Sequence, residues 1–339
     1  MLKIDIHTHI LPPEIPKFKD IFGYGGFIEL IHKPSCCDAD MVLDSGKFFR
    51  KVEPNCFDPQ ARLEDCKKHN VDIQVLSTVP VMFSYWTKPK DGLYVAQYIN
   101  NHLAEVVAQT PKKFIALGTL PMQSVELSIK EARRCVNELK MPGFEIGTHI
   151  NNKNLSHPDF FPLYEALEDM GAALFIHPWE MMGQSDMPDY WLPWLVGMPA
   201  ESARAISSLI FGGVFEKFPK LRVAIAHGGG AFPYTIGRIQ HGHDVRPDLC
   251  AVDCKTPPRD FLGHFYVDSL VHDERALKYL IDTIGVNKIC LGTDYPFPLG
   301  ELEPGKLIES STWLDDKARK ALFSGSALEW LNLSEKQFI

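Results

Sequence analysis

Eight short apolar runs alternate with segments of helical period, and this alternation constrains the fold more than any other feature of the sequence. Strands separated by helices form a parallel sheet. Eight repeats fit a closed (β/α)8 TIM barrel better than an open doubly wound sheet, and no Gly-x-Gly-x-x-Gly motif follows the first run. We therefore predict a single α/β barrel domain over residues 1–339. The expected strands are 2–10, 71–79, 114–120, 143–149, 172–178, 221–229, 265–270 and 288–295, and the expected helices between them are 58–70, 93–109, 125–140, 158–170, 200–211, 233–241 and 274–284.

Residues 12–57 interrupt the alternation, because they separate the first strand from the first long helix by far more than a usual βα loop. The segment holds the glycine cluster FGYGGF and possible short strands at 27–31 and 47–52. It leaves the carboxyl end of a barrel strand, where barrel enzymes place their active sites. We expect it to be a small inserted lid or substrate-contacting subdomain.

The composition is that of a globular protein with a large core, since 45% of the residues are hydrophobic, 23% are charged and the formal net charge is −8. No block of like charge appears, so neither nucleic acid nor an anionic membrane is an expected partner. The N-terminal stretch lacks the apolar core of a secretory signal, and no run approaches membrane-spanning length. The 8 cysteines are scattered, which favours free thiols and a cytoplasmic protein.

The first expected strand reads KIDIHTHIL, and side chains two residues apart in a strand lie on the same face. His7 and His9 are therefore expected to point in the same direction as Asp5. In a barrel the carboxyl ends of the strands converge on one mouth. Imidazole and carboxylate groups are typical zinc ligands, so the sequence predicts a metal site at this mouth. Three later strands also end in ionisable residues, which are His177 in LFIHPW, His227 in VAIAHGGG and Asp294 in CLGTDYP.

Other residues near the predicted site stay open. Asp5 is a candidate to orient an imidazole ring from behind. His149 ends the fourth expected strand and Asp268 lies in the seventh, so either one could touch the site. The glycines after His227 either let the backbone approach closely or form a flexible turn. The remaining histidines fall in expected helices or loops and are expected to be exposed, namely His32, His69, His102, His157, His241, His243, His264 and His272.

The HTH motif, the two later histidines and the final aspartate together resemble the amidohydrolase superfamily of metal-dependent barrels. Bimetallic members of that superfamily bridge their ions through a carboxylated lysine or a glutamate at the end of strand four. Here strand four reads GFEIGTH, which has no lysine, and Glu145 lies early in it. This departure favours one metal ion per chain.

Longer blocks resemble one family of zinc-dependent decarboxylases within that superfamily, and the similarity runs from Lys3 to near Phe338. It implies a single Zn²⁺ held by four ligands, and catalysis by His227 and Asp294, with His227 as an acid/base beside the metal. The implied ligands are His7, His9, His177 and Asp294. The blocks are LSTVPVMFSYW, LGTLPMQ, HPWEM, YWLPWLVGMPAE, GGVFEKFPKLRVAIAHGGGAFP and LGTDYPFPLGELEPGK.

The same resemblance implies a small dicarboxylate substrate and an O2-independent decarboxylation without an organic cofactor. Arg50 in GKFFR and Arg238 in TIGRIQHG are implied to hold the carboxylates, for which guanidinium groups are well suited. Arg238 is implied to come from the neighbouring subunit of a homodimer, while Trp194 and Phe297 line the pocket. Two alternatives stay open. One is another metal-barrel lyase or a hydrolase of a cyclic amide or lactone, and the other is a catalytically inactive metal-binding scaffold.

Overall fold

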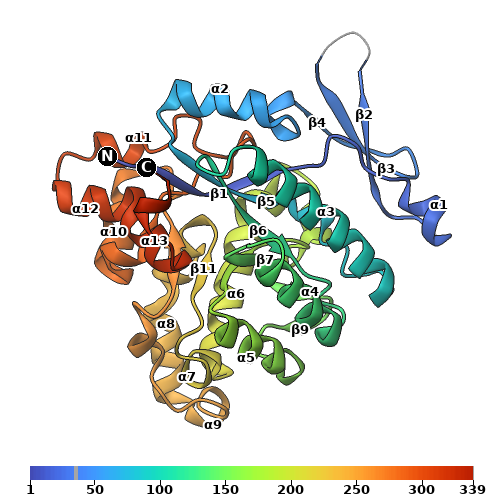
Figure 1. Cartoon of the computed structure of the whole chain (residues 1–339). Coiled ribbons are helices and arrows are strands. Elements are labelled where there is room, and N and C mark those ends of the chain that lie inside the picture. The colour runs from blue at the N-terminus through green and yellow to red at the C-terminus, as the bar shows by residue number, and fades with distance from the viewer. Residues whose placement is uncertain (34–36, 339) are drawn as a thin grey trace.

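The computed structural model describes residues 1–33 and 37–338. Eight parallel strands follow one another in chain order around a barrel (Figure 1). Main-chain hydrogen bonds from Ile6 to Leu291 (2.9 Å) and from His9 to Tyr295 (2.8 Å) join the first strand to the segment after the last one. The predicted (β/α)8 barrel is therefore confirmed. Its strands are β1 (Ile4–Ile10), β5 (Ile73–Thr78), β6 (Phe114–Thr119), β7 (Gly143–Gly147), β10 (Ala173–His177), β11 (Val223–Ile225), β12 (Tyr266–Asp268) and β13 (Ile289–Cys290).

Helices cover the outside of the barrel (Figure 1). Their ends follow local chemistry, since the side chains of Ser124 and Asp273 accept hydrogen bonds from the first-turn N–H groups of α4 and α10, and Gly171 ends α5 in the left-handed conformation. The helices of the barrel layer are α2 (Pro59–His69), α3 (Pro89–Gln109), α4 (Val125–Asn137), α5 (Phe161–Met170), α6 (Met198–Phe211), α7 (Val214–Lys217), α8 (Phe232–Val245), α9 (Pro247–Cys250), α10 (Glu274–Ile284), α11 (Lys306–Ser310), α12 (Asp316–Lys320) and α13 (Ser326–Leu331).

Two strands are much shorter than the sequence predicted. The run at 221–229 supplies only β11, and the run at 288–295 supplies only β13. His227 (φ 57°) and Asp294 (φ 59°) adopt the left-handed conformation, which a strand ladder does not accommodate. Both side chains therefore stand on irregular backbone just beyond the strand ends.

A β-bulge in β1 decides which side chains face the barrel interior. The register between β1 and β5 shifts between Asp5 and Thr8, so β1 carries one residue more than its partner over this stretch. On the N-terminal side of the bulge the inward-facing residues are Ile4 and Ile6, which belong to the inner core, and beyond it they are His7 and His9. The expectation that Asp5 points with the two histidines is wrong, because the extra residue turns its side chain to the outer face.

The barrel interior is filled by side chains from the strands and closed at the end opposite the mouth by α13. Trp330 of this helix is fully buried, with its ring centroid 6.0 Å from that of Phe175. The C-terminal part of the chain thus completes the inner core. The strand residues of this core are Ile4, Ile6, Ile73, Val75, Ile115, Leu117, Ala173, Phe175, Ala224, Ala226, Tyr266 and Cys290.

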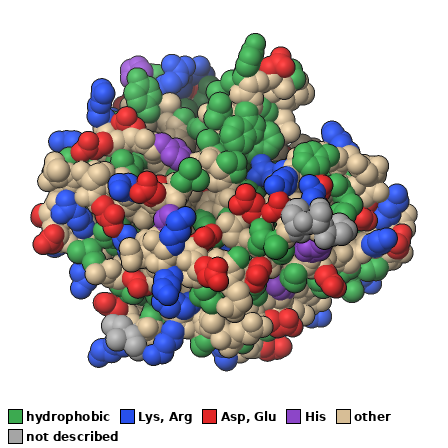
Figure 2. All heavy atoms as spheres, turned by 90° about the horizontal axis from the view of Figure 1, so that it is seen from above, with side chains coloured by type: hydrophobic (Ala, Val, Ile, Leu, Met, Phe, Trp, Pro, Cys, Tyr) green, Lys and Arg blue, Asp and Glu red, His purple; other side chains and the backbone are tan. Residues whose placement is uncertain are grey.

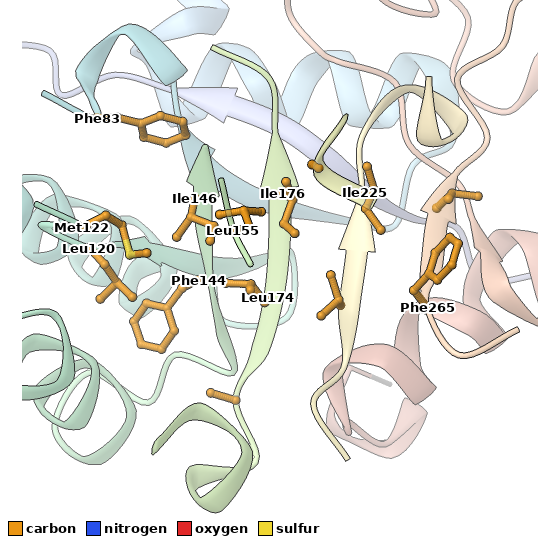
Figure 3. Close-up of a cluster of buried hydrophobic side chains, with 14 of the residues drawn as sticks. Phe83, Leu120, Met122, Phe144, Ile146, Leu155, Leu174, Ile176, Ile225 and Phe265 are labelled. Carbon is orange, nitrogen blue, oxygen red and sulfur yellow. The ribbon is translucent and has the colours of Figure 1, made fainter. Parts of the chain in front are cut away.

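A second core lies between the strands and the surrounding helices. Figure 3 shows part of it, with Ile146 on β7, Ile176 on β10 and Ile225 on β11 standing beside one another on adjacent strands. Side chains alternate between the two faces of a strand, so the residues on either side of Ile176, Phe175 and His177, turn into the barrel. Both strand faces are therefore buried, as is usual for a parallel sheet.

The inserted segment forms α1 (Phe18–Phe22) and a three-stranded antiparallel sheet that projects from the barrel in Figure 1. The expected strands appear as β2 (Ile28–His32) and β4 (Phe48–Val52), whereas β3 (Ala39–Leu43) was missed because five residues show little periodicity. Phe27 packs against Trp86, with ring centroids 4.8 Å apart, and this contact ties the insertion to the barrel. Its function as a lid stays a prediction.

The cysteine thiols in the described part of the chain are free, while Cys36 lies outside the described residues. Within residues 1–33 and 37–338, no helix combines the length and the apolar character needed to traverse a lipid bilayer. On the face shown in Figure 2, basic and acidic side chains are interspersed, so no single sign of charge dominates that face.

Replacing Trp330 by alanine is expected to lower the free energy of unfolding by about 3–5 kcal/mol, because it opens a cavity beneath the barrel core. Urea denaturation followed by circular dichroism measures this change. Trp313, which is 37% exposed, provides the matched control. Trp313→Ala is expected to cost less than about 1 kcal/mol, and equal losses in the two variants would contradict the assignment of α13 as a core element.

Candidate metal centre and active-site pocket

Five ionisable side chains converge at the mouth of the barrel. β1 supplies His7 and His9, β10 ends at His177, and His227 and Asp294 follow β11 and β13. The ring centroids of His7 lie 5.1, 5.0 and 5.1 Å from those of His9, His177 and His227. The Asp294 carboxylate faces this cluster, with Oδ1 3.5 Å from His7 Nε2 and 3.1 Å from His9 Nε2. The structure thus brings together the side chains that the sequence singled out.

The rings of His7, His9 and His177 all turn Nε2 toward the cluster and Nδ1 away from it. In each ring Nδ1 is paired with an oxygen atom behind it, at 2.7 Å from Asp268 Oδ2, 2.9 Å from the Thr78 carbonyl and 2.9 Å from the Pro178 carbonyl respectively. An acceptor at Nδ1 places the ring proton there and leaves a lone pair on Nε2. The three Nε2 atoms are buried and have no hydrogen-bond partner among the described residues. This arrangement is what a bound cation requires.

Burial sets the charge of the cluster. It lowers the pKa of His9 and, helped by the neighbouring imidazoles, holds that of His177 well below its usual value. Burial alone would raise the pKa of Asp294, but the imidazoles of His227 and His9 beside its carboxylate outweigh this effect and hold that pKa well below its ordinary value. The neutral imidazoles of His9 and His177 therefore lie beside an ionised carboxylate.

The donor set fits one first-row divalent metal ion. Within the described residues, ligand atoms of His7, His177, His227 and Asp294 all lie within 4.8 Å of one another, and His9 adjoins them. Three nitrogen donors and one oxygen donor suit zinc and its neighbours in the first row. The arrangement leaves open which four of the five side chains bind the ion, so the ligand set His7, His9, His177 and Asp294 stays a prediction.

His227 differs from the other three imidazoles. Its Nδ1 is buried and has no hydrogen-bond partner within the described chain, so no acceptor fixes its tautomer. Its Nε2 lies 3.7 Å from Asp294 Oδ2. Burial would lower the pKa of His227, but Asp294 overcomes this effect and raises it. A histidine with a raised pKa and no fixed tautomer is well suited to move a proton.

Asp268 holds both His7 and the turn that carries His227. Besides the His7 ring, its carboxylate accepts hydrogen bonds from the main-chain N–H groups of His227 (2.9 Å) and Gly228 (2.7 Å). The glycines of this turn all have positive φ, and a Cβ at Gly230 would overlap the Pro199 carbonyl oxygen. Of the two open interpretations, the packed turn holds and the flexible turn does not.

Asp5 does not orient an imidazole. Its Oδ1 accepts a hydrogen bond from the main-chain N–H of His7 (3.2 Å), and its Oδ2 accepts one from the Thr293 hydroxyl (2.6 Å). Burial raises the pKa of Asp5 to about 8, so its carboxyl group is largely neutral at pH 7. The role expected of Asp5 belongs to Asp268, which a strict two-residue alternation along β1 could not indicate.

Glu145 and His149, the two candidates near strand four, lie outside the ligand cluster. Glu145 approaches His9 on the Nδ1 side, at 3.7 Å, and therefore away from the free Nε2 lone pair. His149 turns instead to Glu201, with Nδ1 3.1 Å from Oε2. Of the histidines expected at the surface, His243 is only 9% exposed, and burial lowers the pKa of His102 to about 4.

A pocket opens above the cluster, and His9, His177 and Asp294 line it. Arg50, Trp194 and Phe297 line it, and the Arg50 guanidinium carbon lies 4.6 Å from the Phe297 ring centroid. Burial lowers the pKa of Arg50, although Asp294 opposes this effect. Three further aromatic residues line the wall and were not expected from the sequence. They lie in the blocks FFR, HPW and YWLPW, whose aromatic content could have indicated an aromatic pocket. They are Phe49, Trp179 and Trp191.

Arg238 lies elsewhere in the structure. Its side chain is exposed on α8, and it is not among the described residues that line the pocket. Among the described residues of a single chain, Arg50 is therefore the one arginine that lines this pocket.

A barrel with this cluster at its mouth defines a metal-dependent enzyme of the amidohydrolase type, and residues 4–333 match the amidohydrolase family, so the chain belongs to it. Over 338 residues it is 57% identical to a 2-amino-3-carboxymuconate-6-semialdehyde decarboxylase of Dictyostelium discoideum, which covers 100% of this chain and 94% of the relative. It is 43% identical to a decarboxylase of the same name from Caenorhabditis elegans, covering 98% of this chain and 95% of the relative. The resemblance to decarboxylases is thus confirmed, and the chain is a metal-dependent carboxy-lyase.

A solved structure supports the fold. It is a dihydroxybenzoic acid decarboxylase from Polaromonas with bound manganese and an inhibitor, and it matches this chain with a TM-score of 0.80 at 22% identity. The match covers 100% of this chain and 99% of the other. At this identity the likeness concerns the barrel itself.

Asp268→Asn is expected to weaken metal binding by about 10- to 100-fold, the usual effect of losing a group that orients a ligand. Both carboxylate oxygens of Asp268 accept from N–H donors, so an amide nitrogen meets a donor in either orientation. Competition with a chromophoric chelator measures the affinity. Asp5→Asn, which replaces a largely neutral carboxyl group by an isosteric amide, is the control and should bind metal as the wild type does.

Proposed function

We propose that this chain catalyses the zinc-dependent, O2-independent decarboxylation of 2-amino-3-carboxymuconate 6-semialdehyde to 2-aminomuconate 6-semialdehyde and CO2. This is a step of tryptophan catabolism through the kynurenine pathway. The observation that carries the proposal is the Arg50 guanidinium in a pocket directly above the His and Asp cluster, in a chain 57% identical to a decarboxylase named for this substrate. Free cysteine thiols agree with a cytoplasmic location, which stays a prediction.

The residues of the chain divide the chemistry between them. Arg50 binds a substrate carboxylate and orients the molecule over the cluster, because a guanidinium group pairs with both carboxylate oxygens at once. When bound, zinc supplies positive charge for the substrate and lowers the pKa of a bound water to about 7. His227 delivers a proton to the enamine carbon that carries the departing carboxylate, and the amino end of the conjugated chain becomes an iminium group. The bond to the carboxylate then breaks, its electron pair restores the enamine, CO2 leaves, and His227 regains a proton from water. The aromatic walls exclude water.

A homodimer completes the site in this proposal. A dicarboxylate requires a second cationic partner, and Arg238 is exposed on α8 away from the pocket of its own chain. We propose that Arg238 enters the pocket of the neighbouring subunit.

Another reaction remains the alternative. A metal barrel of this kind could act as a different lyase or hydrolyse a cyclic amide or lactone. Such a neutral substrate needs no arginine, whereas Arg50 lies in the pocket with 4.6 Å between its guanidinium carbon and Phe297. Arg50 therefore favours an anionic substrate.

The direct test is to mix the purified protein with freshly generated 2-amino-3-carboxymuconate 6-semialdehyde. Loss of the absorbance of the substrate and release of CO2 should proceed together, at the same rate with and without O2. Dihydroxybenzoate and a cyclic amide serve as competing substrates. Turnover of either one without turnover of the semialdehyde would refute the proposal.

The metal content should be one ion per chain, because strand four offers no lysine bridge and Glu145 faces the wrong side of His9. Elemental analysis of dialysed protein measures the number and identity of the ions. Two tightly bound ions per chain would contradict a mononuclear site, and manganese or iron in place of zinc would correct the identity of the metal.

His227→Ala is expected to keep its metal ion but to lose about 10²- to 10⁴-fold in kcat, the usual contribution of a positioned acid/base. Metal analysis and steady-state kinetics test the two parts separately. His149→Ala removes a buried imidazole outside the cluster and should leave the metal content and kcat nearly unchanged. A His227→Ala protein that loses its ion would show that His227 is a ligand.

Arg50→Ala and Arg238→Ala are each expected to be nearly inactive, because loss of one partner of a desolvated charge pair costs about 2 kcal/mol or more. Mixing them under subunit exchange should restore activity. Random exchange makes half of the dimers mixed, each with one intact site of two, so recovery should approach about a quarter of the wild-type activity. Each variant exchanged with itself is the control, and no recovery after verified exchange would contradict a shared site.

A further inference from the structure

The most deeply buried cation of the described chain lies outside the pocket, behind β1. Arg62 on α2 is 0% exposed and is among the largest fully buried side chains. Within the described residues, no carboxylate lies at ion-pair distance from its guanidinium, and its Nη2 has no hydrogen-bond partner. A buried charge without a counter-ion is costly, so it is poor evidence for a group that serves stability alone.

The contacts of Arg62 are with main-chain carbonyls rather than with acids. Its Nη1 donates to the carbonyl of His9 (2.6 Å) and to that of Asn55 (3.0 Å), and its Nε donates to the side chain of Gln74 (3.1 Å). Its guanidinium carbon lies 4.7 Å from the centroid of the Tyr295 ring. One side chain thus touches β5 through Gln74 and three further segments of the chain, those of His9, Asn55 and Tyr295.

Asp65, one helical turn further along α2, contacts two of the same residues. Its Oδ2 accepts hydrogen bonds from the Tyr295 hydroxyl (2.6 Å) and from the Asn55 side chain (3.1 Å). Arg62 and Asp65 therefore hold Asn55 and Tyr295 from a single helix face, which a residue serving only to fill space would not do.

Each of these segments carries a functional group. His9 is itself in the cluster, and Tyr295 directly follows Asp294 and precedes Phe297 by two residues. Asn55 lies where the insertion returns to the barrel, three residues after β4, the strand that carries Arg50. The distance between His9 and Asp294, and that between Arg50 and Phe297, both depend on how these segments are fixed against α2.

We propose that Arg62 is a positioning residue that sets the spacing of His9 and Asp294 for the metal ion and that of Arg50 and Phe297 for the substrate. The inference rests on the metal centre described above. Arg62 thereby connects the metal centre with the substrate pocket. The planar guanidinium matters more than its charge, because only such a group can donate from Nη1 to the His9 and Asn55 carbonyls and from Nε to Gln74 while its face lies against Tyr295.

The test compares Arg62→Lys and Arg62→Met with Arg222→Met. Arg222 is the matched control, since its guanidinium also donates to two main-chain carbonyls, those of Trp330 and Gly171, but at the closed end of the barrel. Zn²⁺ affinity by chelator competition, urea denaturation and steady-state kinetics are measured on each protein. Both Arg62 variants should bind Zn²⁺ about 10- to 100-fold more weakly than the wild type and show a raised KM. Arg222→Met should lose stability alone.

Further variants separate the roles. Arg50→Ala should lose activity without changing Zn²⁺ affinity, because Arg50 lines the pocket and is not one of the candidate ligands. If Arg62→Met fails to fold, Asp65→Ala, which leaves the guanidinium in place, should show the same two changes to a smaller extent.

Equal Zn²⁺ affinity in the wild type and the Arg62 variants would overturn the inference and reduce Arg62 to a structural residue. Wild-type affinity in Arg62→Lys alone would also overturn it, since charge would then suffice. A wild-type protein that binds no divalent ion would refute the metal centre itself, which is a different result.

Discussion

Main-chain hydrogen bonds join β1 to the segment after β13 and so bring together the two edges of the sheet. The chemistry at the mouth of the barrel depends on these hydrogen bonds. The His9 N–H donates to the Tyr295 carbonyl at 2.8 Å, so Asp294 is held beside the histidines of β1 although 285 residues separate it from His9. Without this closure the sheet would be an open layer with its ligands at opposite edges. The β-bulge then adds the second requirement, since only the extra residue in β1 turns His7 and His9 inward.

The cluster is prepared for a cation by what lies behind its rings. Asp268 and two main-chain carbonyls occupy the Nδ1 sides of His7, His9 and His177, and this leaves the Nε2 lone pairs directed at one point. Burial disfavours protonation of His9 and His177, so the Nε2 lone pairs of these two rings remain available at neutral pH. The ordered acceptors, rather than the histidines alone, make the cluster specific for a metal ion.

The eightfold alternation and the residues of the mouth could be read from the sequence, because hydrophobic periodicity and strand-end residues are local signals. The bulge could not, since KIDIHTHIL alternates regularly and only pairing with β5 reveals the extra residue. For the same reason Asp5 was mistaken for the group behind an imidazole, a role that Asp268 takes from a strand 261 residues away from His7. The left-handed conformations of His227 and Asp294 could not be predicted either, because the short strands and the irregular segments that follow them have the same apolar composition.

The position of α13 at the closed end of the barrel affects the order in which the protein folds during its synthesis. The inner faces of the strands, beginning with β1, stay uncovered at this end of the barrel until Trp330 packs against them. Leu2 and Phe338 pack against the same inner core. During synthesis on the ribosome, the chain must emerge as far as Trp330 before that core is sealed. Parallel strands with uncovered apolar faces are slow to settle and prone to aggregate. The inner core is therefore completed only once α13 is available to cover it.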